Sequence, residues 1–283
     1  MAQVINTNVM SLNSQRALGR SQSSMQNSLE RLSSGLRINR AKDDAAGLAI
    51  TERITSQVRG LDQAIRNAND GISLLQTAEG ALNEVTNALQ RMRELAVQSA
   101  NGTYNSSDRQ SLQDEFGALQ QEIVRIAAVT EFNNINLLGQ ASTLSMQVGW
   151  ENGTNNVINV IARDLSGTSA NGGISFALHS AMSIGSTGGP AAAQQAMSYL
   201  QSAINKVSEL RADFGAIQNR LESAVRNMEN VIENQSAARS RIQDADFARE
   251  TANLTRTQIL QQAGTAMLAQ ANQLPQNVLS LLQ

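Results

Sequence analysis

The sequence predicts a mainly α-helical protein: a long coiled-coil rod formed by the N- and C-terminal segments, with a small β-hairpin in the middle. Two observations predict it. Aromatic residues make up only 3% of the 283 residues, and there are only two prolines. Small residues and leucines suit closely approaching helices better than a core filled by bulky rings. Apolar residues also recur in steps of three and four over long segments, which is the period of a packed helix.

The first expected element is an N-terminal helix. Its apolar stripe steps by seven, four, three and four through Leu18, Met25, Leu29, Leu32 and Leu36. The stripe is too narrow to form a globule alone. We therefore expect this helix to pair with one near the other end of the chain, and the apolar surface left over to contact neighbouring subunits.

The longest expected helix lies between residues 58 and 96. Its apolar positions step by three and four, with one repeated three that is typical of a stammer in a coiled coil. They are Val58, Leu61, Ile65, Ala68, Ile72, Leu75, Ala78, Leu82, Val85, Leu89, Met92 and Ala96. At 1.5 Å per residue the segment spans about 57 Å, which predicts a rod.

A third helix follows a break at residues 101–108. The break is rich in Asn, Ser and Gly, and Asp108 is expected to cap the new helix. The seam of this shorter helix contains Leu112, Phe116, Leu119, Ile123 and Ile126.

Residues 141–189 break the helical pattern, being rich in Gly, Ser, Thr and Asn. Alternation at Leu144, Met146 and Val148, a turn-like stretch, and a β-branched run at 157–161 predict a β-hairpin over 142–163. A loop to residue 190 follows, and Pro190 is expected in the first turn of the next helix.

Two further seams complete the pattern. The second long helix is expected through Met197, Leu200, Ile204, Val207, Leu210, Phe214, Ile217, Leu221, Ala224, Met228 and Val231. A C-terminal heptad stripe runs through Leu260, Ala263, Met267, Ala271, Leu274, Val278 and Leu281. The three middle helices predict a bundle, and the two ends predict a paired coil.

Composition excludes several classes of partner. With 22 basic and 24 acidic residues the net charge is -2, so no strong field attracts nucleic acid or an anionic membrane. There is no cysteine for disulfides or thiolate chemistry. We expect no membrane insertion, because no apolar run approaches the length of a bilayer span. No secretory leader is recognised either, so export is expected to use another route.

Enzymatic chemistry is not expected. The single histidine, His179, has no nearby carboxylate pattern, and we expect no metal and no cofactor. The acidic pairs Asp43 with Asp44 and Asp244 with Asp246 do not converge on one helix face. We expect them at helix ends or in ion pairs.

Long stretches near both ends resemble bacterial flagellin. The stretches at 1–8, 30–39, 41–50, 66–73, 79–84, 89–98, 240–246, 258–264 and 269–282 carry this resemblance. Together the match covers roughly residues 1–140 and 190–283. The middle is short, which implies a form without large outer domains.

The resemblance implies a structural protein that polymerises into the filament of the bacterial flagellum and serves motility. It implies an inner core coiled coil from residues 1–44 and 244–283, and a helical bundle domain from 45–243. The residues of the self-assembly coil would be Leu29, Leu32, Leu36, Leu260, Ala263, Met267, Leu274, Val278 and Leu281. The family is secreted by a type III export apparatus. Implied partners are copies of the chain, an export chaperone at the C-terminal segment, and the filament cap and hook-junction proteins.

The resemblance also implies recognition by host flagellin receptors. The vertebrate cell-surface receptor would contact Arg91, Leu95 and Glu115. The segment from Glu30 to Thr51 resembles the peptide perceived by plants. Its matching positions are Glu30, Arg31, Leu32, Ser33, Gly35, Asn39, Asp43, Asp44 and Gly47.

Three alternatives stay open on the residues alone. An intracellular coiled-coil scaffold would share the heptads, and a hook–filament junction protein would share the terminal helices. An enzyme would need turnover dependent on His179 or an acidic pair. We further predict that residues 1 to about 40 and 244–283 are disordered in the isolated monomer, because each stripe alone buries too little surface to offset the ordering entropy.

Overall fold

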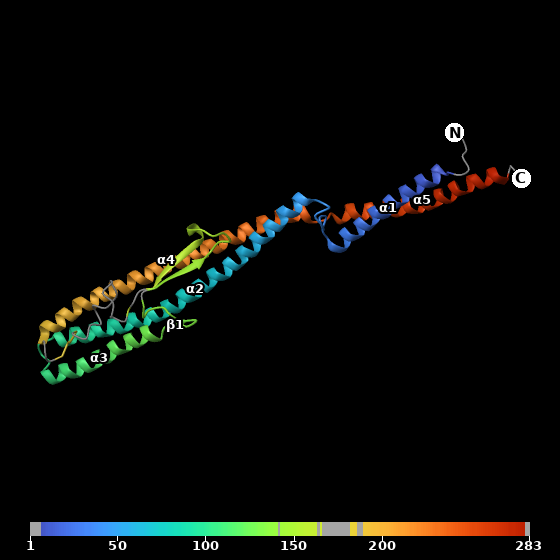
Figure 1. The fold of residues 1–283 in the computed structure, drawn as a ribbon. Coiled ribbons are helices and arrows are strands. Elements are labelled where there is room, and N and C mark those ends of the chain that lie inside the picture. Colours follow the sequence, from blue (N-terminus) through green and yellow to red (C-terminus); the bar gives the residue numbers. More distant parts are fainter. Residues whose placement is uncertain (1–6, 141, 163–164, 166–181, 186–188, 281–283) are drawn as a thin grey trace. The chain divides into compact units, whose positions relative to one another are not determined.

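The computed structural model describes residues 7–140, 142–162, 165, 182–185 and 189–280, without the side chains of 274–280 (Figure 1). The helices are α1 (Val9–Ser34), α2 (Ala45–Ala100), α3 (Ser106–Val129), α4 (Gly189–Gln243) and α5 (Phe247–Ser280). The strands are β1 (Glu131–Phe132), β2 (Ile135–Asn136), β3 (Ser142–Gln147) and β4 (Val157–Ala162), with the short 3-10 helix η1 (Thr154–Asn156) before β4. The predicted fold class is confirmed. Within the described ranges, no helix has the length and apolarity needed to cross a membrane.

The chain divides into two compact units. The terminal unit contains Met1–Val58 and Glu233–Gln283, and the central unit contains Arg59–Ile232. The division falls inside α2 and α4. In the terminal unit, α2 and α4 are linked by polar contacts, including one from Gln235 Nε2 to Gln57 Oε1 at 3.2 Å.

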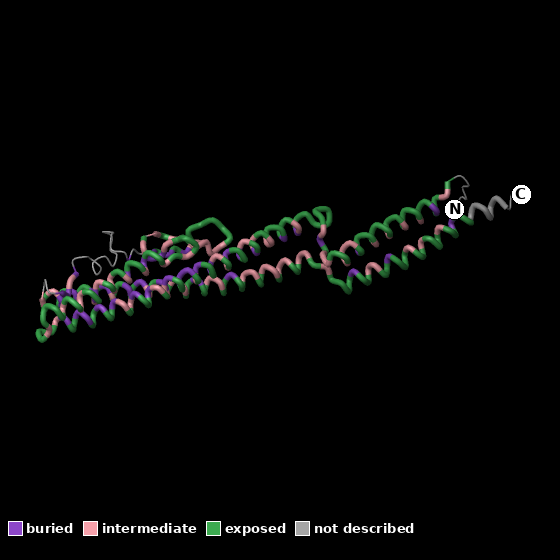
Figure 2. Tube along the Cα trace, turned by 90° about the horizontal axis from the view of Figure 1, so that it is seen from below, coloured by how far each residue is buried: buried purple, intermediate pink, exposed green. Residues whose placement is uncertain are grey.

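The three predicted seams form the core of the central unit. On α2, Leu75, Leu82, Val85, Leu89 and Met92 are fully buried. The same holds for Phe116 and Ile123 of α3 and for Leu200, Val207 and Leu221 of α4. Figure 2 shows these buried stripes along the helices. The three-helix bundle predicted from apolar spacing is confirmed.

The start of α3 corrects one expectation. The capping residue is Asn105, whose Oδ1 accepts a hydrogen bond from the Asp108 amide at 2.8 Å. Asp108 Oδ2 in turn accepts from the Asn105 amide at 3.2 Å. Asp108 therefore closes a capping box from the third helical position and is not the cap itself.

The predicted hairpin is confirmed as antiparallel β3 and β4, with Ser142 opposite Ala162 and Gln147 opposite Val157. It packs against α2. A Cβ on Gly60 would lie 2.8 Å from the Trp150 Cβ, so only glycine permits this approach. Residues 163–164 and most of the predicted loop to residue 190 lie outside the described residues.

A second, smaller hairpin was not predicted. β1 and β2 pair across Asn133 and Asn134, which both adopt left-handed backbone conformations with φ of 50° and 62°. Asparagine tolerates this region better than most residues, which explains the Asn-Asn sequence at a tight turn. Pro190 lies in the first turn of α4, as expected.

In the terminal unit, α1 and α5 lie side by side and antiparallel (Figure 1). Asn8 Nδ2 donates to the Ala271 carbonyl at 2.7 Å, and Ser21 Oγ donates to the Thr257 carbonyl at 3.1 Å. These bonds set the register of the pair. The predicted pairing of the two chain ends is confirmed.

Candidate functional site

The most deeply buried residues of the seam between α1 and α5 are small or polar, and the half-buried side chains of Leu18, Met25 and Leu268 lie beside them. Ser11, Ser28, Thr257 and Ala271 are all less than 9% exposed. At Gly264 a Cβ would lie 3.4 Å from Leu18 Cδ1, an ordinary contact distance. Small side chains allow the two helices to approach closely, but they bury little apolar surface.

The outward faces of the same two helices carry large apolar side chains among polar ones. Eight large apolar side chains of α1 and α5 are between 49% and 60% exposed. Leu29 lies near the end of α1 and Phe247 begins α5; the other six are Val9, Met10 and Leu12 of α1, and Ile259, Leu260 and Met267 of α5. Figure 2 shows mostly exposed residues along this pair. We call these six residues the outer apolar face. An isolated amphipathic pair would normally bury its apolar side and expose its polar side, so this pair has the pattern of an element that other surfaces cover.

The expectation that pairing buries both apolar stripes holds for most of the α1 stripe, where Leu18, Met25 and Leu32 are half-buried, but it is wrong for the α5 stripe. Leu29 is half exposed, and Leu260 and Met267 point away from the seam. Two heptad stripes share α5: Thr257, Gly264 and Ala271 face α1, whereas Leu260 and Met267 do not. Spacing alone could not show which stripe faces the partner helix.

The other expected coil residues are placed as follows. Leu32 and Leu36 are half-buried and Ala263 is exposed. Leu274 and Val278 belong to α5, but their side chains lie outside the description, as does all of Leu281. The role of these residues in self-assembly stays a prediction.

One buried carboxylate ties α1 to α5. Glu250, 7% exposed, accepts hydrogen bonds from Ser28 Oγ at 3.0 Å and from Arg31 Nη1 at 3.1 Å. Glu250 lies near the N-terminal end of α5, and its charge-assisted hydrogen bonds to Ser28 and Arg31 fix the register of α1 against α5 at that end.

The link from α1 to α2 is held by backbone contacts with the α4–α5 connection. Gly35 ends α1 with a φ of 72°, a conformation that favours glycine. The Arg37 amide donates to the Gln243 carbonyl at 2.6 Å, and the Ala245 amide donates to the Gly35 carbonyl at 2.9 Å. These backbone hydrogen bonds hold the α1–α2 connection against the α4–α5 connection.

The acidic pairs serve helix ends and turns in this region. Asp44 Oδ1 accepts from the Gly47 amide at 2.8 Å at the start of α2, and Asp246 Oδ1 accepts from the Ala248 amide at 2.9 Å at the start of α5. A Cβ on Gly47 would clash with Asp44 Oδ2. The expectation of helix-end roles is confirmed for Asp44 and Asp246.

Asp43 stabilises the turn itself. Its Oδ2 accepts from the amides of Asn39 at 3.2 Å and Arg40 at 3.1 Å. The hydrogen bond from the Arg40 backbone, followed by that from Asn39, holds the pKa of this carboxyl below its ordinary value of 3.8. Several of the expected plant-recognition residues, including Asn39, Asp43 and Asp44, thus form hydrogen bonds within the folded chain.

A charged cluster lies on the surface of the central unit, where α2 faces α3. Arg91 pairs with Glu115 at 2.9 Å and with Glu94 at 3.0 Å, and about half of the Arg91 and Glu115 side chains is exposed. Hydrogen bonds to Glu94 and then to Glu115 raise the pKa of Arg91. Leu95, expected as a surface contact, is 1% exposed and belongs to the core.

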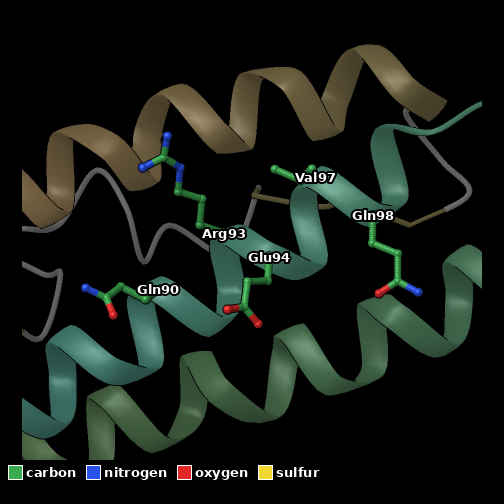
Figure 3. A pocket seen from close by; sticks show the side chains of 5 residues that line it. All are labelled: Gln90, Arg93, Glu94, Val97 and Gln98. Carbon is green, nitrogen blue, oxygen red and sulfur yellow. The ribbon is translucent and has the colours of Figure 1, made fainter.

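A shallow hollow lies on the exposed side of α2 next to this cluster (Figure 3). It is lined by Gln90, Arg93, Glu94, Val97 and Gln98. All five side chains come from one helix and are exposed, so the hollow is a surface feature and not an enclosed pocket.

A catalytic or metal site has no support among the described residues. In those ranges, no group of three or more His, Cys, Asp or Glu residues could hold a metal ion. His179, considered as a catalytic candidate, lies outside the described residues.

Comparisons with known proteins agree across the whole chain. A family model of the bacterial flagellin N-terminal helical region matches residues 5–143, and one of the bacterial flagellin C-terminal helical region matches residues 197–282. A flagellin of Halalkalibacterium halodurans is 49% identical over 281 residues, covering 99% of this chain and 100% of the relative. The flagellar filament 33 kDa core protein of Treponema phagedenis is 45% identical over 288 residues, covering 99% of this chain and 100% of the relative.

A solved structure supports the fold. A putative flagellar hook-associated protein from Vibrio parahaemolyticus has a TM-score of 0.58, with 71% of this chain and 100% of that chain covered. Its sequence is only 12% identical, so this likeness concerns the fold alone.

Proposed function

Since the chain belongs to the bacterial flagellin family, we propose that it is a structural subunit that polymerises with copies of itself into the extracellular filament of the flagellum. The family is one of structural proteins, not of enzymes. Relatives that match over nearly the whole length support this reading over a hook–filament junction protein or an unrelated coiled-coil scaffold.

The observation that carries this proposal is the outer apolar face of α1 and α5. Six half-exposed apolar side chains lie on a helix pair whose most deeply buried seam residues are small or polar. At about 25 cal/mol per Å², covering this surface supplies a driving force that the isolated pair lacks. Copies of the chain packing around one another would supply the cover, and Leu260, Ala263 and Met267 would lie in these contacts.

The same proposal assigns roles to the chain ends. Residues 1–44 and 244–283 form the inner core of the filament, and residues 45–243 form the surrounding domain. The C-terminal segment is also the site for an export chaperone before assembly. Secretion through the flagellar export apparatus and contact with the cap and hook-junction proteins complete the proposed partners.

We further propose that the Arg91–Glu115 pair is a contact for the vertebrate flagellin receptor. The pair is half exposed, and the hollow beside it adds a mainly apolar surface formed by side chains of the same helix. Leu95 would act only by supporting the α2 face, because it is buried.

For plant receptors, we propose recognition of residues 30–51 as a peptide released from the fold. In the folded chain Gly47 is buried, and the carboxylates of Asp43 and Asp44 accept backbone hydrogen bonds. A receptor that reads these groups needs them freed from the turn.

Seeded polymerisation tests the main proposal. Purified monomer added to short filament fragments should elongate them, and removal of residues 1–40 or 244–283 should abolish elongation. Full elongation by both truncated chains would contradict the proposal. The central unit of each truncated chain should retain its helical circular dichroism, which checks that loss of assembly is not loss of fold.

A receptor-reporter assay tests the vertebrate contact. Arg91→Ala and Glu115→Ala should each reduce signalling by about tenfold or more, in the range of interface hot spots. Arg125→Ala is the matched control, because Arg125 forms another exposed ion pair, with Glu122 at 2.6 Å on α3. Equal loss in the control would contradict the assignment.

A further inference from the structure

Methionines are the only readily oxidised side chains in α1 and α5. Residues 9–34 and 247–280 contain no Cys, His, Trp or Tyr, and their methionines are Met10, Met25 and Met267. Met10 is 56% and Met267 60% exposed, whereas Met25 is half-buried along the seam. Oxidation of a thioether follows its accessibility, so Met10 and Met267 are the reactive pair.

The register of the helix pair puts these two methionines at one level. Asn8 bonds to the Ala271 carbonyl and the helices run antiparallel, so Met10 lies opposite the turn of α5 that precedes Ala271. Met267 belongs to that turn. Both thioethers are members of the outer apolar face, where copies of the chain are proposed to meet.

We propose that Met10 and Met267 form an oxidative modification site that controls whether a free chain can enter the filament. The oxidant is of the peroxide class. One oxygen atom passes from hydrogen peroxide to each thioether sulfur: the O–O bond breaks, an S–O bond forms, and the peroxide is reduced to water. This inference rests on the proposed self-assembly.

The sulfoxide changes the contact that assembly needs. A flexible apolar side chain becomes polar, and burying its S–O group without a hydrogen-bond donor costs free energy. In the filament the same side chains are covered by neighbouring copies. The site is therefore open in the free chain and protected after assembly.

Peroxide footprinting of the monomer tests the site without reference to assembly. Mass spectrometry of peptides should show Met10 and Met267 oxidised at least tenfold faster than Met92 and Met228, which are 0% and 4% exposed. Rates for Met10 and Met267 no higher than those for Met92 and Met228 would overturn the assignment.

Seeded polymerisation then tests the consequence. The oxidised chain should need a roughly tenfold or higher concentration to elongate filaments, since two apolar contacts are lost per copy. A methionine sulfoxide reductase should restore elongation. Unchanged elongation after full oxidation of both residues would overturn the inference, whereas failure of untreated chain to elongate would overturn the proposed function instead.

The double variant Met10→Leu with Met267→Leu separates these two side chains from the rest. Leucine conserves volume and apolarity but cannot be oxidised, so this variant should elongate filaments before and after peroxide. Loss of elongation after peroxide in the variant would show that other groups are responsible. If the untreated variant elongates filaments poorly, the natural chain is used instead. Recovery of its elongation after treatment with methionine sulfoxide reductase then shows whether methionine oxidation caused the loss.

Discussion

Neutralising Glu250 should weaken assembly while leaving the central unit intact. In Glu250→Gln the side chain keeps its shape but loses the charge that Arg31 and Ser28 bond to. Hydrogen bonds to charged groups contribute about 1.5–3 kcal/mol. Because a third of the Arg31 side chain remains in water, we take the lower part of that range, about 1.5–2 kcal/mol.

The assay is the critical concentration for seeded polymerisation. Each 1.4 kcal/mol corresponds to about tenfold in an equilibrium constant, so the concentration should rise by roughly ten- to thirtyfold. Thermal unfolding of the central unit should not change, since Glu250 lies in the terminal unit.

Glu222→Gln is the matched control. Glu222 pairs with Arg226 at 3.7 Å, with more than half of each side chain exposed. Exposed pairs of this kind contribute about 0–1 kcal/mol, so the control should change the critical concentration by no more than about fivefold. Equal effects of the two substitutions would show that the buried ion pair between α1 and α5 does not support assembly.

Three further predictions address folding and pH. Because the pKa of Asp43 is lower in the folded chain than its ordinary 3.8, its stabilising contribution is complete above that value and is lost as pH falls through the folded pKa. Filament disassembly as the pH falls below about 3.8 should thus be less pH-dependent in Asp43→Asn, and an unchanged profile would contradict this. Leu82→Ala should lower the free energy of urea unfolding of the central unit by about 2–5 kcal/mol, against about 0.5 or less for exposed Val97→Ala; similar losses would count against the core assignment. Amides of residues 9–34 and 247–280 should exchange rapidly in monomer and slowly in filament, and full protection in monomer would show that the ends are already ordered.

The helical core could be predicted from the sequence because its residues obey a simple period. Leu75, Leu82 and Leu89 recur every seven residues and all three are fully buried. Where a helix has a single apolar stripe and packs against a single core, the spacing of its apolar residues is sufficient to predict which of them are buried. The β3–β4 hairpin was predicted for the same reason, since its residues alternate between two faces.

The terminal helices could be predicted to pair, but not through which face. On α5 the Leu260–Met267 stripe is the more apolar one, so hydrophobicity favoured it as the intrachain seam. The observed seam uses Thr257, Gly264 and Ala271, whose small size permits close approach. Sequence patterns do not distinguish burial within a chain from burial between chains.

The candidate recognition residues show a similar limit. Resemblance grouped Arg91, Leu95 and Glu115, yet exposure depends on which side of α2 faces the bundle. Arg91 and Glu115 meet at the surface, whereas Leu95 points into the core. Residues 91 and 95 are four apart and lie on neighbouring parts of the α2 surface, but the bundle covers only part of the helix circumference. The spacing alone therefore does not show that one of them is exposed and the other buried.

In the proposed filament, neighbouring copies cover the outer apolar face. The chain has no cysteine, so Ala263→Cys introduces a single exposed thiol beside Leu260 and Met267. Its labelling rate with a maleimide is measured in monomer and in seeded filament. We predict fast labelling in monomer and at least a tenfold slower rate in filament, as expected for a thiol buried by contact. Equal rates in the two states would contradict the account.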